Sequence, residues 1–556
     1  MKFKKYILIA ILIVAAFLRL WRLGNIPPSL TPDEASLGYN AYSVLKTGRD
    51  EYGKLLPVIF KSFGDYKPGL YVYLTVPSVL VFGLNEFAVR LPSALFGIIS
   101  VWLIYLVVKK LFHSLEIKNY KLEIIAAAVA AMNPWLIYFS RGAWEVNVSL
   151  ALTLAGIYFF LKLEQSTKYI VHSAVFFALT LICYQGAKLS TGIVVLLLIA
   201  IYLKRIIKLE PKKIIIAIVL GLLISSPILL SFTSGQTGRL EVFSVFSYRR
   251  PAEYLQAFLD QGNEKVGTLS YYLFHSEALN FKRGIMGRYF NHFSGRFLFF
   301  EGDWGNPRHS APYSGMLLLS DLVLLMVGIY TLVRSKLNKE HWFIIAWLIL
   351  APLPSVLSRD QVHAVRSINM VIPLIIILSF GLSNIMEILN KNRLKIILYA
   401  GGGIIYLAGL LYFLDSYFIH VPKHNSQLWE YGYKQVVQEV SKIQQNYKTI
   451  KVQQSFAQPY IYFLFYQKYD PAKYQKNAKL TVADSALDVG YVTQIDNIKF
   501  VPIDWSVNRG ESGTLFVADP IRIPPEDSKD ENLFKVISEI KYLNGRDIAF
   551  RVVEVR

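Results

Sequence analysis

The chain has 556 residues, of which 54% are hydrophobic and 14% are aromatic, and its mean hydropathy is +0.37. This composition, with many apolar runs that approach or exceed the length needed to cross a bilayer, excludes a soluble protein and predicts a polytopic membrane protein. The net charge of +20 does not indicate a nucleic-acid partner. Most lysines and arginines lie at the ends of apolar runs, as the positive-inside bias produces.

The N-terminal segment MKFKKYILIAILIVAAFLRLWRL predicts a retained first membrane helix at about residues 6 to 22, with the N-terminus inside. It lacks a small-x-small cleavage site. The next apolar piece, residues 69–84, contains Pro77 and is short for a span, so we expect an interfacial helix there. Placing that piece on the surface puts every basic loop on one side of the membrane and gives about eleven spans. They are residues 6–22, 87–108, 122–140, 146–163, 168–184, 187–203, 213–232, 313–333, 341–357, 367–388 and 395–415.

The opposite face then collects the polar residues that lie between spans. It receives the external loops 23–86 and 233–312, the turns 141–145, 184–190 and 358–367, and the end of the chain. Beyond about residue 420, amphipathic helix patterns such as LWEYGYKQVVQEVSKIQQ alternate with strand-like runs such as GTLFVAD. We therefore expect a membrane domain over residues 1–420 and a soluble extracytoplasmic α/β domain over residues 421–556. The single cysteine, Cys183, excludes an intrachain disulfide and suits a prokaryotic plasma membrane.

Two adjacent acids, Asp33 and Glu34, open a helix in the first external loop. Thr31, Pro32 and Glu34 fit the N-cap, first and third positions of a capping box, so Glu34 is expected to cap the helix. Asp33 would point outward, where the helix dipole keeps it ionised. An ionised carboxylate at the mouth of a membrane cavity could serve as a general base.

Several cations share the predicted outer face. Lys67 in DYKPGLYVY is either a boundary lysine that reaches toward head groups or a phosphate ligand. Arg141 and Glu145 either pair with one another in their turn or join Asp33 as a phosphate-binding cation and a second acid. Lys188 is a further cation, and the late turn SRDQVHAVRS offers His363 and Arg366, which could also be simple membrane anchors.

No cofactor is expected. His275 with Glu277, or His292 with Glu301, could bind a divalent metal, but no tight ligand spacing supports a metal site. The chain has no P-loop, no Gly-rich dinucleotide fingerprint, no HExxH and no GxSxG, so a nucleotide-driven transporter or a soluble-cofactor enzyme has no motif behind it.

Five segments together resemble the GT-C glycosyltransferases that use polyprenyl- or dolichyl-phosphate sugars, such as the protein O-mannosyltransferases and the lipid A aminoarabinose transferases. The resemblance covers about the first 165 residues, and the rest follows by topology. The segments are LRLWRLGNIPPSLTPDEASLGYNAYSVL, YKPGLYVYL, NEFAVRLPSALFGIISVWLIYLV, NPWLIYFSRGAWEVNVSLAL and HAVRSINMVIPLIII.

The resemblance implies that Asp33 acts on the acceptor hydroxyl, that Lys67 holds the lipid phosphate, and that Arg141 and Lys188 support that site. We assign Glu145 to the catalytic acids and the late-turn residues, His363 and Arg366, to the donor site. The chain departs from the pattern with KPG where KPP is usual and with Glu145 where relatives often carry Asp.

The leading hypothesis is an inverting glycosyltransferase of the outer membrane face, with Asp33 as general base. A lipid phosphate leaves without being protonated, so one base suffices, and cations can stabilise the departing charge. The expected partners are a polyprenyl-phosphate-linked sugar donor and a protein, lipid or cell-wall glycan acceptor. The alternative is a transporter or flippase of lipid-linked sugars, which would need ionisable groups near mid-membrane and broken helices in paired positions.

Overall fold

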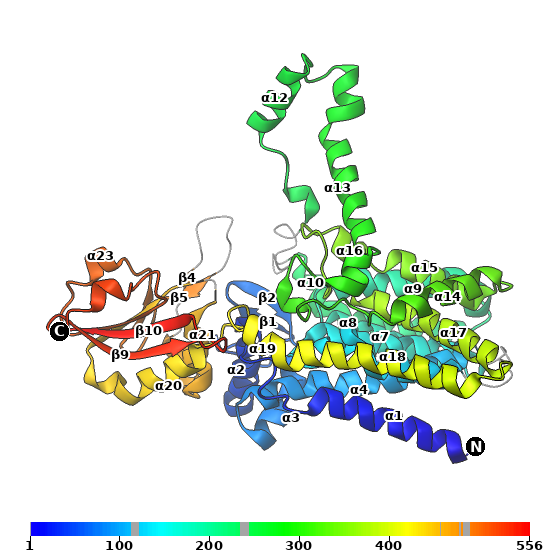
Figure 1. Ribbon diagram of the computed structural model, residues 1–556, viewed down its shortest axis with the longest axis horizontal. Coiled ribbons are helices and arrows are strands. Elements are labelled where there is room, and N and C mark those ends of the chain that lie inside the picture. Colours follow the sequence, from blue (N-terminus) through cyan, green and yellow to red (C-terminus); the bar gives the residue numbers. More distant parts are fainter. Residues whose placement is uncertain (1, 113–121, 234–243, 456, 478–479, 482–489) are drawn as a thin grey trace.

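A computed structural model describes residues 2–112, 122–233, 244–455, 457–477, 480–481 and 490–556. The molecule is elongated, with a bundle of long helices at one end and a mixed sheet domain at the other (Figure 1). The N-terminus lies at the far end of the bundle and the C-terminus lies in the sheet domain. The predicted fold class, a polytopic helical membrane protein with a C-terminal α/β domain, is confirmed.

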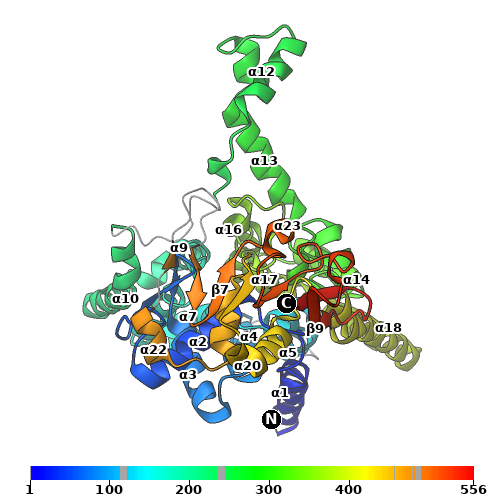
Figure 2. The ribbon, with the colours of Figure 1, turned by 90° about the vertical axis from the view of Figure 1, so that its left-hand side faces the viewer.

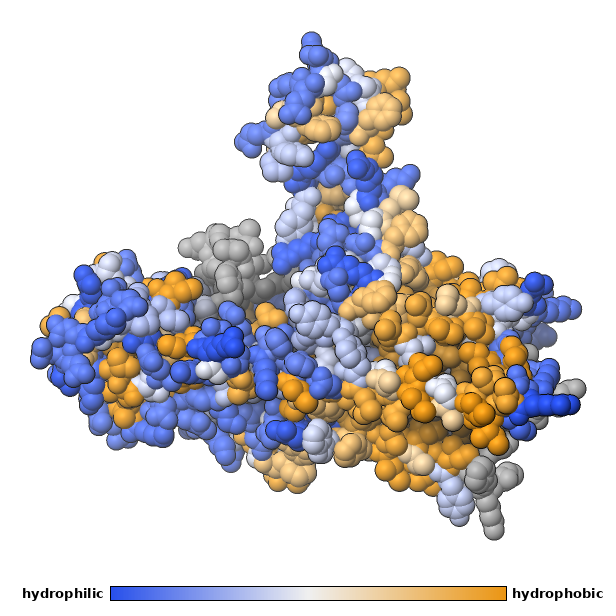
Figure 3. Space-filling view, viewed as in Figure 1, coloured by the Kyte–Doolittle hydropathy of each residue, from blue (hydrophilic) through white to orange (hydrophobic). Residues whose placement is uncertain are grey.

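Each predicted span overlaps a helix. The bundle contains α1 (Lys2–Leu20), α4 (Glu86–Leu111), α5 (Leu122–Met132), α6 (Pro134–Phe139), α7 (Glu145–Leu161), η1 (Lys162–Glu164), α8 (Tyr169–Leu181), α9 (Ala187–Ile206), α10 (Pro211–Ser231), α14 (Asp321–Arg334), α15 (Lys339–Leu350), α16 (Leu353–Val356), η6 (Ile368–Met370), α17 (Val371–Asn390) and α18 (Lys395–Asp415). Within the described residues, six helical segments are long and apolar enough to cross a membrane. A belt of apolar side chains covers the bundle, and hydrophilic surface covers the sheet domain (Figure 3).

The predicted span at residues 122–140 is broken between α5 and α6. Asn133 stands at the break, where its side chain accepts a hydrogen bond from the Leu136 amide at 3.1 Å, and Pro134 opens the second helix. A proline without an amide hydrogen fits this first helical position. The break turns the chain toward the loop that holds Arg141 and Trp144.

The first external loop folds into a compact unit. It contains α2 (Pro32–Thr47), a hairpin of β1 (Ile59–Ser62) and β2 (Asp65–Pro68), and the interfacial helix α3 (Leu70–Phe82). α3 has 13 residues, so it is a short apolar helix like α5 and α8. The antiparallel register pairs Phe60 with Lys67.

The second external loop has a different form. It contains η2 (Val245–Ser247), α12 (Ala252–Gln261), η3 (Tyr271–His275), α13 (Glu277–Asn291), η4 (Arg296–Phe300) and η5 (Pro307–His309). Residues 248–291 project from the body at a right angle to the bundle, which both views show (Figures 1 and 2). We call this segment the arm.

The C-terminal domain follows η7 (Ser416–His420) and α19 (Val421–His424). Its six-stranded sheet has the order β6-β7-β3-β8-β10-β9, in which β3 is parallel to β7 and β8 and the remaining pairs are antiparallel. The strands are β3 (Thr449–Gln453), β6 (Gln494–Ile495), β7 (Ile498–Val501), β8 (Thr514–Ala518), β9 (Phe534–Lys541) and β10 (Ile548–Val555). The remaining elements are α20 (Tyr433–Ile443), η8 (Gln444–Asn446), α21 (Pro459–Tyr466), α22 (Pro471–Asn477), β4 (Leu480–Thr481), β5 (Tyr491–Val492), α23 (Trp505–Asn508) and η9 (Glu526–Ser528).

The first loop and the C-terminal domain share one hydrophobic core. The residues of α21 from Pro459 to Phe465 are all buried, and this helix contacts α2 as well as α20. At Gly38 of α2, an added β-carbon would come within 2.5 Å of Val89 and 2.6 Å of Phe465. Such close packing fixes α2 between the membrane bundle and the sheet domain, so the helix that begins with the two acids is held from both sides.

Candidate active site

A pocket of about 530 Å³ opens where the first loop meets the ends of the membrane helices. Five separate stretches of the chain supply its charged residues: the start of α2, the β1–β2 hairpin, the start of α7, the start of α9, and the late turn before η6. The charged residues that line it are Asp33, Asp65, Lys67, Glu145, Lys188 and Arg366. Five of these six were predicted as site residues, and the fold brings these five together.

Asp33 stands at the second position of α2, with 58% of its side chain exposed. Its carboxylate forms an ion pair with the Lys67 ammonium. Unpaired backbone amides at a helix N-terminus carry partial positive charge, which suits an acidic side chain at this position. Asp33 faces both solvent and the pocket.

Lys67 reaches the pocket from β2, next to the conformationally fixed Pro68. Burial opposes the charged ammonium, but the carboxylates of Asp33, Glu145 and Asp65 outweigh it, so the pKa of Lys67 lies above its ordinary value. The ammonium also lies 5.4 Å from the centre of the Phe63 ring. Lys67 is thus a cation with acids around it, and its ammonium points into the pocket toward Asp33.

Glu34 has the capping role that its spacing predicts. The Thr31 hydroxyl accepts a hydrogen bond from the Glu34 amide at 3.2 Å, and the Thr31 amide donates to Glu34 Oε2 at 3.0 Å. The same carboxylate accepts from Arg90 Nε at 3.0 Å and from the Ala143 amide at 2.8 Å. Glu34 is buried, and its hydrogen bonds tie α2 to α4 and to the turn before α7. Of the two adjacent acids, only Asp33 faces the pocket.

The remaining predicted residues of the pocket come from helix ends. Glu145 is the first residue of α7, and Lys188 is the second residue of α9, where its ammonium lies 4.7 Å from the Phe232 ring centre. Arg366 enters from the late turn and pairs with Asp360 at 2.5 Å. Three cations and three acids therefore share one pocket, an arrangement suited to a ligand that carries a phosphate and a group to be deprotonated.

Arg141 does not line this pocket, so the pocket gives its predicted role in donor binding no support. Its guanidinium is fully buried and donates to the backbone carbonyls of Leu18, Trp21 and Ile26 at 3.0, 2.7 and 3.2 Å. It also stacks 4.7 Å from the Phe418 ring centre. Arg141 does not pair with Glu145 either, because it satisfies the carbonyls at the end of α1 instead. The residue is structural.

His363, also predicted for the donor site, does not line the pocket either. It is nearly buried beside His309, with the ring centres 4.9 Å apart. Burial, followed by the charges of Arg366 and the neighbouring histidines, keeps the pKa of His363 well below its ordinary value. Of the two late-turn residues predicted for the donor site, only Arg366 reaches the pocket.

A group of potential metal ligands lies behind the pocket. The ligand atoms of Asp303, His309 and His363 all lie within 4.8 Å of one another. Asp303 already accepts hydrogen bonds from His309 at 3.0 Å and from the Ala364 amide at 2.7 Å, so its carboxylate orients the loop. Neither metal pair suggested by the sequence forms. His275 binds Glu264 while Glu277 binds Arg250, and His292 binds Ser355 while Glu301 binds Arg296.

Sequence reasoning missed two acids near Lys67. Asp65 lines the pocket, and its position two residues before Lys67 on one strand could have revealed it, because such residues share a face. Glu51 is fully buried behind the hairpin and hydrogen-bonds Asn40 at 3.4 Å. Burial raises the pKa of Glu51 to about 8, against weaker opposition from Asn40. Nothing in the local sequence marks Glu51 as buried.

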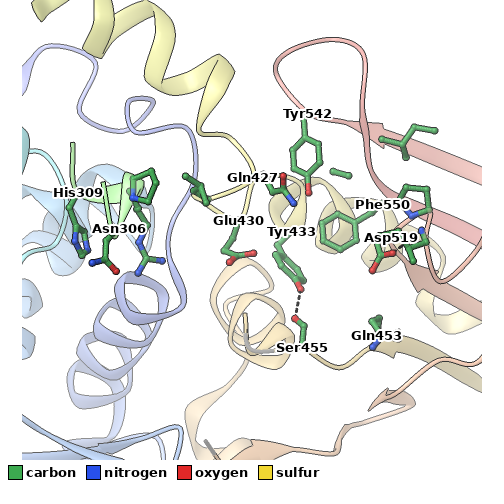
Figure 4. Close-up of a pocket in the computed structure, with 18 residues that line it drawn as sticks. Asn306, His309, Gln427, Glu430, Tyr433, Gln453, Ser455, Asp519, Tyr542 and Phe550 are labelled. Carbon is green, nitrogen blue, oxygen red and sulfur yellow. Dashed lines mark hydrogen bonds between the residues drawn. The ribbon is translucent and has the colours of Figure 1, made fainter. Parts of the chain in front are cut away.

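A second, larger pocket of about 800 Å³ lies between the membrane domain and the sheet domain (Figure 4). Asn306 and His309 line it from the membrane side, and Tyr542, Phe550 and Asp519 line it from the sheet side. Glu430 projects into the space between them, and burial raises its pKa to about 7 despite the charge of Arg308. We call this space the interdomain pocket. Trp144 lies between the two pockets, since it packs on His309 at 5.5 Å and precedes Glu145 in the chain.

Comparisons with known proteins bear on the fold and on one segment of the chain. The family model of dolichyl-phosphate-mannose-protein mannosyltransferases matches residues 66–230, a segment that holds Lys67, Glu145 and Lys188. No curated protein matches the chain. Among solved structures, ArnT from Cupriavidus metallidurans bound to undecaprenyl phosphate superposes with a TM-score of 0.54 at 12% identity, over 98% of this chain and 97% of that one. Its apo form gives a TM-score of 0.53 at 12% identity, over 98% and 96% of the two chains.

The archaeal oligosaccharyltransferase AglB from Archaeoglobus fulgidus matches less closely, with a TM-score of 0.47 at 13% identity, over 83% of this chain and 64% of that one. The ArnT likeness shows the fold, and the family match falls on the segment that carries most of the pocket. The two findings together indicate a membrane glycosyltransferase with a GT-C-type fold. Within the chain, residues 66–230 are the part similar to the dolichyl-phosphate-mannose-protein mannosyltransferases. The transporter alternative has no comparable support.

Proposed function

We propose that the chain moves a sugar from a polyprenyl-phosphate donor to an acceptor hydroxyl in the pocket around Lys67, with inversion and with Asp33 as general base. The observation that carries this proposal is the Asp33–Lys67 ion pair in a pocket that also holds Lys188 and Arg366. A base and a phosphate-binding cation are the two groups that this reaction needs side by side.

The reaction is a single displacement. The acceptor oxygen attacks the anomeric carbon of the sugar as the bond from that carbon to the phosphate oxygen breaks, and the acceptor proton passes to Asp33. The lipid phosphate leaves as a dianion. Attack from the face opposite the leaving group inverts the configuration, so the product carries the opposite anomer from the donor.

Lys67 can pair first with the Asp33 carboxylate and then with the donor phosphate. While it pairs with Asp33, its positive charge lowers the basicity of that carboxylate. A donor phosphate that draws the ammonium away raises the basicity of Asp33 at the moment when a base is required. Lys188 and Arg366, on other walls of the pocket, add positive charge that stabilises the departing phosphate. Glu145 is the second proposed catalytic acid, and its carboxyl group interacts electrostatically with both Lys67 and Asp33.

The interdomain pocket is the proposed place for the part of the acceptor that does not react. Aromatic rings of Tyr542 and Phe550 face amide, carboxylate and guanidinium groups across it, a lining that suits a polar ligand with apolar faces. Replacing Tyr542 by alanine should raise the KM for the acceptor and leave the KM for the donor unchanged. A change in the KM for the donor, with no change in the KM for the acceptor, would contradict this placement.

The proposal also includes the side of the membrane on which the two pockets lie. We propose that both pockets and the C-terminal domain face the outside of a prokaryotic plasma membrane, because the predicted basic loops lie at the other end of the bundle. A cysteine placed at the exposed Val507 should react with an impermeant maleimide in intact cells.

The decisive experiment replaces Asp33 by asparagine. Membranes that contain the variant are given labelled polyprenyl-phosphate sugars, and transfer to endogenous acceptors is followed. We expect kcat to fall by about 10²- to 10⁴-fold, the usual contribution of a general base, with donor binding retained. The matched control is Asp527→Asn, which alters an exposed acid of the sheet domain and should keep full turnover. Full turnover by the Asp33 variant would refute the assignment.

A further inference from the structure

The arm, residues 248–291, is the part of the molecule that the reaction leaves unexplained. It runs at a right angle to the long axis of the bundle, so it lies parallel to the plane of a membrane that the bundle crosses (Figures 1 and 2). Along the bundle axis, it stands where the apolar belt gives way to the hydrophilic sheet domain (Figure 3). The arm therefore extends along the membrane surface and not into bulk solvent.

The arm has almost no core of its own. Leu259 is the one residue of α12 that is buried, and α13 has none. A few contacts join its two sides, among them Arg250 with Glu277 at 3.0 Å and Phe258 with His275 at 5.2 Å between ring centres. Helices of this length draw most of their stability from packing against another surface. Within the described residues, the body of the protein contacts the arm through α13 near its root, for example at Phe281 and Tyr289. The many exposed apolar side chains further out therefore invite a surface from outside the chain.

The exposed side chains indicate which surface that is. Large apolar residues stand out along the whole arm: Tyr254, Phe258, Val266, Leu269, Tyr272, Leu273, Phe274, Met286 and Phe290 are all more than 40% exposed. In the space-filling view, the apolar side chains of the arm gather on the side that faces the apolar belt of the bundle (Figure 3). The arm and the belt thus form one continuous apolar surface around the same lipid.

The charges of the arm complement acidic head groups. Its exposed cations are Arg249, Lys265, Lys282 and Arg283, whereas its exposed acids are Glu253 and Asp260. On α13, Lys282 lies one turn before Met286 and two turns before Phe290, so a cation shares a helix face with exposed apolar groups. Long basic side chains beside aromatic residues are typical of helices that lie in the membrane interface.

We propose that the arm is an interfacial lipid-binding element that rests on the acidic head groups of the leaflet from which the lipid donor enters. Its root connects this contact to the active site. Ser244 and Phe246 line the pocket around Lys67, and the Phe246 ring packs against Phe281 of α13 at 5.6 Å. Lipid binding along the arm holds Phe246 against the pocket mouth. This second role rests on the proposed function, whereas the lipid contact itself does not.

Fluorescence tests the lipid contact directly. Leu273, 56% exposed, is replaced by cysteine and labelled with an environment-sensitive nitrobenzoxadiazole group, and Val507→Cys in the sheet domain, 71% exposed, is the matched control. The native Cys183 is buried and should not compete for label. The full-length proteins are placed in vesicles of equal parts phosphatidylcholine and phosphatidylglycerol. We expect a blue-shifted label at 273 that nitroxide-bearing lipids quench, and a water-exposed, unquenched label at 507. Equal exposure of the two labels would overturn the proposal.

Charge reversal tests the choice of lipid. The double variant Lys282→Glu, Arg283→Glu should lose the blue shift in vesicles with phosphatidylglycerol and should raise the KM for a long-chain donor there by about fivefold or more. With a short-chain donor in solution, the double variant should have the same KM as the unmodified protein. The control is Lys541→Glu, Arg546→Glu on exposed positions of the sheet domain. An equal effect on both donors would overturn the link to the pocket. Absence of transfer with every donor would refute the proposed function and leave the fluorescence result standing.

Discussion

The two long loops on the pocket side of the bundle are built in opposite ways. The first loop, residues 23–86, is packed on both sides, against the bundle and against α21 of the sheet domain. The arm in the second loop has a single buried residue in α12 and none in α13. Both loops are rich in charge, yet only the packed loop places charged side chains in the pocket around Lys67. Precise chemistry needs side chains held by a surrounding core, whereas contact with a fluid surface does not.

The largest effect should follow from loosening the first loop at Glu34. The variant Glu34→Gln removes the charge that Arg90 needs and leaves a buried guanidinium without its partner. Breaking a buried ion pair from one side costs about 3–5 kcal/mol. We expect a clear fall in the unfolding temperature in detergent, with residual folded protein still active.

The matched control for Glu34 is Glu439→Gln, which breaks an exposed pair with Lys442 on α20. If the two variants unfold at the same temperature, the buried pair in the first loop contributes no more to stability than the exposed pair on α20.

Lys67 tests whether the packed loop performs chemistry. The variant Lys67→Met keeps the length of the side chain and removes the cation, so kcat/KM for the lipid-phosphate donor should fall by about 10²- to 10³-fold, as on loss of one group that stabilises a developing anion. Lys61→Met on the neighbouring strand is the control, because Lys61 pairs with Tyr66 across the hairpin and does not line the pocket. Equal kinetics for the two variants would remove Lys67 from the reaction.

Glu51 gives the first loop a pH dependence. Its pKa in the folded chain, about 8, lies above the ordinary value of 4.5, because burial penalises the carboxylate. The protonated form is therefore the one that the fold accepts, and its contribution to stability is complete below about pH 4.5 and is lost as the pH rises toward 8. Glu51→Gln should raise the unfolding temperature at pH 9 more than at pH 5. A gain that is the same at both pH values would contradict the burial of an acid there.

The smallest effect should come from the arm. Glu277→Gln weakens the pair with Arg250, which solvent reaches, so the cost in stability should be at most about 1 kcal/mol. Turnover of a short-chain donor in solution should stay within experimental error of the unmodified protein. A large loss in that assay would show that the arm takes part in the chemistry, and the contrast between the two loops would fail.

Local sequence was sufficient for much of this description. Apolar run lengths located a helix at each predicted span, and the spacing of Thr31, Pro32 and Glu34 gave the capping box and separated the roles of the two acids. These features depend on neighbours within a few residues, so the order of residues in the sequence is enough to predict them. The same reasoning selected Asp33, Lys67 and Glu145, which the fold gathers into one pocket.

Other outcomes depended on contacts between residues far apart in the chain. Arg141 looked like a phosphate ligand because it is a cation in an external turn, but three carbonyls near the end of α1 take up its hydrogen bonds. Glu51 carries no local sign of burial, and the interdomain pocket requires two domains that meet. Burial, charge pairing and the direction of the arm are set by which surfaces come together, and only the tertiary structure decides that.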